Sequence, residues 1–179
     1  MILGTATVRP RASGLRHRRL SPAALAWAAV AGAAAMALAV PVLILAHGAT
    51  TTLVPTGVVI GFAYPAVGAL IARRHPRNAV GWLFIVIGFT QALVAFAFEY
   101  ATYALDVRPG SLPFGVAMAW LSDWMWFPGY ALILTFLLLL FPNGRLPSRR
   151  WRPVAGLAAL SFALMALTAL ATVPAQVGR

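Results

Sequence analysis

The 179-residue chain contains no cysteine. Without a thiol it can form no disulfide, thiolate metal site or palmitoylated cysteine, and it offers no cysteine nucleophile. Acidic residues and histidines are also scarce, with three of each. They are Glu99, Asp106 and Asp123, and His17, His47 and His75. Because the histidines lie in three separate segments, we expect no metal site and no bound cofactor.

The sequence also lacks the motifs that usually indicate catalysis. It contains no Walker loop, GxGxxG, HExxH or GxSxG pattern and no paired carboxylates. Three acids and three scattered histidines leave too few groups for a catalytic site. We therefore expect no catalytic residue and no enzyme activity in this chain.

What the chain has in abundance is apolar sequence. Hydrophobic residues make up 61% and charged residues 9%, whereas about a quarter of the residues of a soluble domain are charged. Five apolar runs are long enough to cross roughly 30 Å of hydrocarbon as helices. They cover residues 22–46, 53–72, 79–98, 118–141 and 154–173. The predicted fold class is all-α, a single integral membrane helical bundle over residues 21–176 in the cell membrane.

All fourteen basic residues are arginines, and twelve of them lie in alternate connecting segments. These segments are residues 9–19, 73–77 and 145–152. Moving a guanidinium across the bilayer centre costs several kcal/mol, so short arginine-rich segments stay in the cytoplasm. We therefore predict a cytoplasmic N-terminus, with residues 1–20 as a basic, disordered tail and 177–179 as an outer tail. A cleaved signal peptide is the alternative, but its apolar region would be only about 7–15 residues long.

The net charge of +11 helps to predict which partners the chain binds. It is divided among three short segments at one membrane face, with no basic helix to follow a phosphate backbone, so we expect no nucleic acid. The expected partners are the lipid bilayer and anionic lipids at the cytoplasmic face, at on the order of 1 kcal/mol per arginine. The Gly57-x-x-x-Gly61 pattern permits close packing within the bundle or a homodimer. A separate signalling partner is also open.

Local signals set several helix boundaries. Ser21 and Pro22 form a helix start, and Asn78 can cap the third helix. We expect residues 106–113, which contain Pro-Gly, to form a loop, and Pro174 to end the last helix.

A group of polar and aromatic residues at the outer ends of the third and fourth runs is the one ligand-site hypothesis. It consists of Glu99, Tyr100, Trp120, Asp123 and Trp124. An ionisable residue in an apolar run indicates a functional site by default, and these residues are suited to a small ligand on the outer face. The alternative is that Asp123 reaches interfacial water or pairs with Arg108, and that Glu99 simply ends the third helix.

Two connecting segments carry a family resemblance. They are Arg73–Phe84, RRHPRNAVGWLF, and Phe136–Trp151, FLLLLFPNGRLPSRRW. Together they resemble the N-terminal membrane region of actinobacterial sensor histidine kinases, over roughly residues 60–155. The resemblance implies an input module, which in that family precedes a helix pair with the phosphorylated histidine and an ATP-binding domain. Neither is present in this sequence, so no catalytic residue of the family has a counterpart here.

Three functions follow as hypotheses. The first is a membrane sensory or input module that signals by helix rearrangement, with no chemistry in this chain. The second is a transporter or channel component, which needs polar groups in mid-membrane, where the sequence offers chiefly Thr90, Gln91 and Thr135. The third is a non-functional truncated fragment.

Overall fold

The computed structural model describes residues 21–46, 48, 55–141, 144–146 and 148–177, and every regular element in these ranges is a helix. Their order is α1 (Pro22–Ala46), α2 (Pro55–Arg74), α3 (Ala79–Thr102) with the π-helix η1 (Tyr103–Val107), α4 (Gly115–Ala131) with the π-helix η2 (Leu132–Leu137) and α5 (Leu138–Leu140), and the 3-10 turn η3 (Arg149–Trp151) with α6 (Arg152–Val177). Among the described residues, five helical segments are long and apolar enough to cross a membrane. The predicted all-α bundle of five such helices is confirmed.

The two predicted helix caps are also confirmed. The Ser21 hydroxyl accepts a hydrogen bond from the Ala24 N–H at 3.1 Å. The Asn78 side chain accepts one from the Val80 N–H at 3.0 Å. Each cap satisfies a backbone donor that the first helical turn leaves open, so α1 and α3 begin where the sequence places them.

Several helices end later than predicted. The third continues through η1 to Val107, nine residues beyond 98, and α6 runs past Pro174 to Val177. The prediction counted only the residues needed to cross the hydrocarbon, but backbone hydrogen bonding does not stop there. Pro174 removes a single donor close to the end of its helix, where that loss does not stop the helix. Residues 1–20, 53–54 and 178–179, which the sequence analysis assigned to the tails and the second run, lie outside the described residues.

The centre of the bundle is the antiparallel contact between α2 and α3. A Cβ added at Gly61 would lie 2.7 Å from the Ala92 Cβ, and one at Gly68 would lie 2.6 Å from the Gly81 carbonyl oxygen. Gly57, the other glycine of the GxxxG pattern, also faces α3, at Ala95. The pattern is therefore used for close packing inside the bundle.

Helix α1 packs on this pair through a stripe of small residues. Ala26, Ala33 and Ala37 are all buried on the same helix face, and Ala26 joins Ala69 and Ala72 of α2 in one cluster. Alanine side chains allow helices to approach closely, and their packing loses no rotamer entropy. The three N-terminal helices thus form one tightly packed unit.

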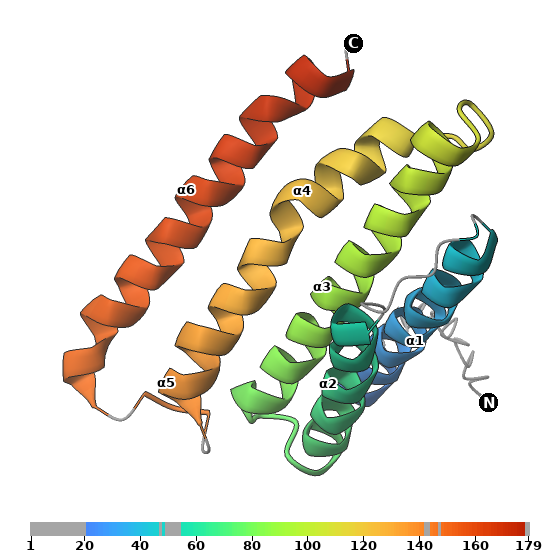
Figure 1. Ribbon diagram of the computed structural model, residues 1–179. Coiled ribbons are helices and arrows are strands. Elements are labelled where there is room, and N and C mark those ends of the chain that lie inside the picture. Colours follow the sequence, from blue (N-terminus) through green and yellow to red (C-terminus); the bar gives the residue numbers. More distant parts are fainter. Residues whose placement is uncertain (1–20, 47, 49–54, 142–143, 147, 178–179) are drawn as a thin grey trace, which may run out of the picture.

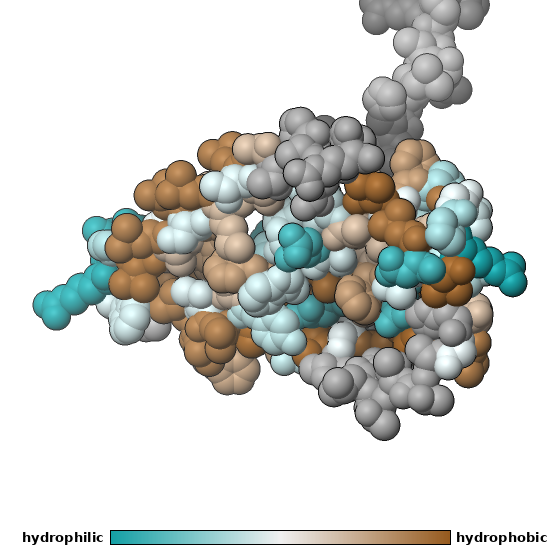
Figure 2. All heavy atoms as spheres, turned by 45° about the horizontal axis from the view of Figure 1, so that its top comes forward, coloured by the Kyte–Doolittle hydropathy of each residue, from teal (hydrophilic) through white to brown (hydrophobic). Residues whose placement is uncertain are grey.

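The outside of the bundle is apolar. Leu38, Leu45, Leu134 and Leu138 are between 67% and 79% exposed, and Figure 2 shows apolar side chains open at the surface around a more polar region. Water-soluble proteins rarely expose apolar patches of this extent, whereas lipid tails would cover them. Helix α6 is the most exposed of these helices, because only 6% of its 18-residue apolar stretch is buried.

The connections divide between the two ends of the bundle (Figure 1). The α2–α3 and α5–α6 connections lie at one end, which contains Arg74, Arg77 and Arg145 and is called the arginine end below. The α3–α4 connection lies at the other, called the acidic end because Asp106 and Asp123 are close to it. Helix α6 stands at the side of the bundle, next to α4.

Gly88→Ala tests the importance of the α2–α3 contact. A methyl group at residue 88 would run into the ring of Pro65, and overpacking of this kind typically costs ~1–3 kcal/mol. The matched control is Gly156→Ala on α6, where nothing lies within 4 Å and alanine should stabilise the helix by up to ~1 kcal/mol. We expect Gly88→Ala alone to lower the unfolding temperature in mild detergent. Equal unfolding temperatures for the two variants would contradict this packing.

Candidate functional site

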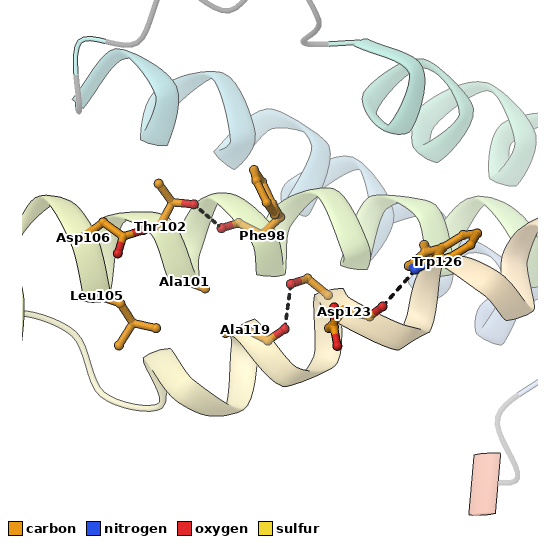
Figure 3. A pocket seen from close by; sticks show the side chains of 9 residues that line it. Phe98, Ala101, Thr102, Leu105, Asp106, Ala119, Asp123 and Trp126 are labelled. Carbon is orange, nitrogen blue, oxygen red and sulfur yellow. Dashed lines mark hydrogen bonds between the residues drawn. The ribbon is translucent and has the colours of Figure 1, made fainter. Parts of the chain in front are cut away.

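A cavity of about 410 Å³ lies between α3 and α4 at the acidic end (Figure 3). Its first wall, from α3 and η1, consists of Phe98, Ala101, Thr102, Leu105 and Asp106. Its second wall, from α4, consists of Ala119, Ser122, Asp123 and Trp126. Each wall of the cavity therefore contains one acidic residue, Asp106 or Asp123.

The α3–α4 connection is held close to the end of α3. Gly115, the first residue of α4, packs so closely on η1 that an added Cβ would lie 3.0 Å from the Ala104 Cβ. The Tyr100 hydroxyl donates a hydrogen bond to the Pro113 carbonyl at 2.8 Å. Gly110 turns the chain with a φ of +78°, a value that favours glycine. These contacts hold the start of α4 against the end of α3.

The hydroxyl and indole hydrogens around the cavity already donate hydrogen bonds to backbone carbonyls of their own helices. The Thr102 hydroxyl donates to the Phe98 carbonyl at 3.0 Å, and the Ser122 hydroxyl donates to the Ala119 carbonyl at 2.8 Å. The Trp126 indole N–H donates to the Asp123 carbonyl at 2.8 Å. The cavity thus presents acceptor oxygens rather than donors to a ligand.

This chemistry suits a cation. The exposed carboxylates of Asp106 and Asp123 supply negative charge, and the rings of Phe98 and Trp126 supply aromatic surface. An organic ammonium group can pair with carboxylates and lie against aromatic faces at once. The described residues contain no group of three histidines, cysteines or carboxylates that could hold a metal ion.

Only Asp123 of the five predicted site residues lines the cavity. Tyr100 instead bonds to the α3–α4 connection. The Trp120 indole N–H donates to the Ala169 carbonyl of α6 at 3.1 Å, and the Trp124 ring lies 5.5 Å from that of Trp120. Glu99 is half-buried and is not part of the cavity wall. The five predicted residues therefore do not form one site: Asp123 lines the cavity, Tyr100 contacts the α3–α4 connection, and Trp120 bonds to α6.

Asp106, Thr102, Ser122 and Trp126 line the cavity but were not among the predicted site residues. Their helical spacing was not recognised because the third helix was predicted to end at residue 98. If that helix is extended, residues 98, 102 and 105 recur at helical spacing on one face, as do 119, 122 and 126 on the fourth helix. The helical spacing would then be enough to suggest which residues form the two walls of the cavity.

A polar group is buried at mid-bundle, where α4 is irregular. Gln91 is 3% exposed, and its Nε2 has no hydrogen-bond partner in the described part of the chain. It faces Gly129, where an added Cβ would lie 3.2 Å from that nitrogen. The neighbouring Pro128 has no N–H to donate within α4, and the π-helix η2 begins at Leu132. The missing bond and the wide π turn together weaken α4 at this level.

Helix α6 contacts α4 mainly through aromatic groups. The Phe162 ring lies 6.3 Å from that of Phe127 in α4 and 5.9 Å from that of Phe136 in η2. The hydrogen bond from Trp120 to Ala169 adds one polar link at the acidic end. Since α6 is otherwise largely exposed, these contacts hold it to the bundle.

Asp123→Asn tests the charge complementarity of the cavity. One unit charge at about 4 Å contributes roughly 1 kcal/mol in a water-like dielectric, so affinity for tetramethylammonium should fall about fivefold. The measurement is isothermal titration calorimetry in detergent. Ser122→Ala, which keeps both charges, is the control and should bind as the parent protein does. Unchanged affinity in Asp123→Asn would contradict a role for this carboxylate.

Comparison of the chain with models of protein families, with curated proteins and with solved structures gives no match. Its function must therefore be argued from the cavity, the helix packing and the distribution of charge.

Proposed function

We propose that this chain is a multi-pass cell-membrane protein that acts as a sensory or input module. A cationic small ligand enters the cavity between α3 and α4, and the signal passes along the bundle as a rearrangement of helices. The chain supplies no catalytic group of its own. The resemblance of residues 73–84 and 136–151 to the membrane part of sensor histidine kinases is consistent with this role.

The observation that carries this proposal is the unequal packing of the helices. Helices α1, α2 and α3 form a close-packed unit, whereas α6 rests on α4 through a few aromatic contacts. Between the cavity and the arginine end, α4 is interrupted by Pro128 and η2. A ligand that draws the two cavity walls together would therefore bend α4 more readily than α3, and α6 would follow.

The distribution of charge supports insertion with the arginine end in the cytoplasm. Arg73 and Arg74 end α2 and Arg77 follows it, and four more arginines lie between residues 145 and 152. The acids Asp106 and Asp123 are at the opposite end. Trp120 and Trp126 also lie toward that end, as expected for an interfacial aromatic belt.

Transport has weaker support. The Thr90 hydroxyl donates to the Val86 carbonyl at 2.8 Å, and the Thr135 hydroxyl donates to the Ala131 carbonyl at 2.6 Å. Both are thus bonded within their own helices. Gln91 is left as the one of these three mid-bundle groups with a free donor, which is too little to line a path.

Two matched serine substitutions test the topology, because a chain without cysteine allows single-cysteine labelling. Ser111 and Ser148 are both exposed, at the acidic and the arginine end respectively. In intact cells a membrane-impermeant maleimide should label Ser111→Cys and leave Ser148→Cys unlabelled until the cells are permeabilised. The reverse pattern would overturn the orientation, and labelling of both sites in intact cells would overturn the five-span topology.

Spin labels test the mobility of α6. Leu38 on α1, Val86 on α3 and Leu160 on α6 are all exposed and can carry labels. In nanodiscs, double electron–electron resonance should give a narrow distance distribution for the 38/86 pair. The 38/160 pair should give a broader one that shifts when tetramethylammonium is added. Equally narrow distributions that do not respond to this ion would contradict signalling through α6.

A further inference from the structure

A second cavity lies at the arginine end of the bundle, far along α3 and α4 from the first. Its volume is about 790 Å³, and it lies between the α2–α3 connection and the segment after α5. Basic side chains dominate its wall, namely Arg74, His75, Arg77 and Arg145. No acidic residue lines it, since Glu99, Asp106 and Asp123 all belong to the other half of α3 and α4.

Three hydrogen bonds hold the α2–α3 connection, which carries His75 and Arg77 directly after Arg74 at the end of α2. The His75 N–H donates to the Ile71 carbonyl at 2.7 Å, and the Asn78 N–H donates to the His75 carbonyl at 2.9 Å. The Trp82 indole N–H donates to the Pro76 carbonyl at 3.0 Å. Because the backbone is fixed, binding of an anion would not need to order this loop, which favours affinity.

The segment after α5 is fitted against the same loop. Gly144 has a φ of +69°, and its N–H donates to the Leu140 carbonyl at 2.7 Å. A Cβ at this residue would overlap the Asn78 Oδ1 and would lie 2.8 Å from the Ala79 nitrogen. Only glycine satisfies both the backbone and the space available. Its position places the next residue, Arg145, in the wall of the cavity.

This contact also joins the two segments that carry the family resemblance. Residues 74–78 belong to the first segment and residues 144–145 to the second, and they are about 70 positions apart in the sequence. Their shared feature is a set of guanidinium groups around one cavity. Guanidinium groups bind phosphate oxygens through paired N–H donors, and several together suit a multiply charged phosphate.

We propose that this cavity binds a phosphate group, supplied by the headgroup of an anionic phospholipid. The lipid source rests on the proposed membrane insertion, which places the arginine end among the headgroups of the cytoplasmic leaflet. Arg74 and Arg77 bind from one side and Arg145 from the other, so the headgroup links the α2–α3 connection to the end of α5. This is a defined site, in contrast to the diffuse anchoring expected from arginine content alone.

The test is calorimetric titration of the full chain in neutral detergent with short-chain phosphatidic acid. Short-chain phosphatidylcholine and inorganic phosphate are titrated in parallel. Arg77→Gln and Arg145→Gln should each weaken phosphatidic acid binding about tenfold, because each loses a charge-assisted hydrogen bond. The matched control is Arg73→Gln, which removes the same charge from the last turn of α2, next to Arg74 but outside the cavity wall. It should change affinity less than about twofold.

Gly144→Ala separates geometry from charge, since it keeps every arginine but displaces the segment that carries Arg145. We expect it to weaken binding as much as Arg145→Gln does, in protein that still elutes as a folded species in size-exclusion chromatography. Equal losses in Arg73→Gln, Arg77→Gln and Arg145→Gln would overturn the site in favour of diffuse charge. Inorganic phosphate binding as tightly as phosphatidic acid would overturn the lipid source.

The outcome can be separated from that of the proposed function. The titration is made in detergent and does not depend on orientation in a bilayer. Absence of phosphatidic acid binding would overturn the site even if Ser111→Cys and Ser148→Cys label as expected. Reversed labelling with intact, selective binding would overturn the proposed topology and leave the phosphate site in place.

Discussion

The close approach of the α2 and α3 backbones is the contact on which the rest of the bundle depends. Gly61 lies against Ala92 and Gly68 against Gly81, with no room for a further carbon atom. Between helices in lipid there is little hydrophobic gain, because lipid tails are as apolar as leucine, so dispersion contacts between small residues must supply the attraction. Helix α1 adds its alanine face to this pair, and α4 packs on the opposite part of α3.

Packing loosens from this centre toward α6. Helix α3 contacts α1, α2 and α4, whereas α6 has contacts with α4 and its continuation η2. The helix between these two environments, α4, is also the one with an internal proline followed by a π-helix. A fixed helix beside an interrupted one gives the bundle a place to bend, and both cavities have walls on or next to this pair.

The two cavities have opposite chemistry. At the acidic end, the hydroxyl and indole hydrogens are already bonded to backbone carbonyls, so the wall presents acceptors and two carboxylates. At the arginine end, the free groups are guanidinium donors on loops that the backbone holds in place. The α4 interruption lies between the two cavities, because the first is lined by α4 residues before Pro128 and the second by residues after α5. A bend at this interruption offers a physical route by which the ends can influence each other.

The sequence by itself determined the class of fold, the two capped helix starts and the placement of twelve of the fourteen arginines in segments without acids. These depend on composition and on residues within one or two turns, such as Ser21 and Asn78. The tertiary structure alone decided which residues share a cavity, including Asp106 with Asp123 and Arg77 with Arg145. Helices such as α1 and α6 are apolar on nearly all sides, so their sequences carry no polar stripe that would fix how each helix is rotated toward its neighbours. That rotation comes instead from the fit of small residues between helices. The sequence records this fit only in part, as in the Gly57-x-x-x-Gly61 pattern of α2.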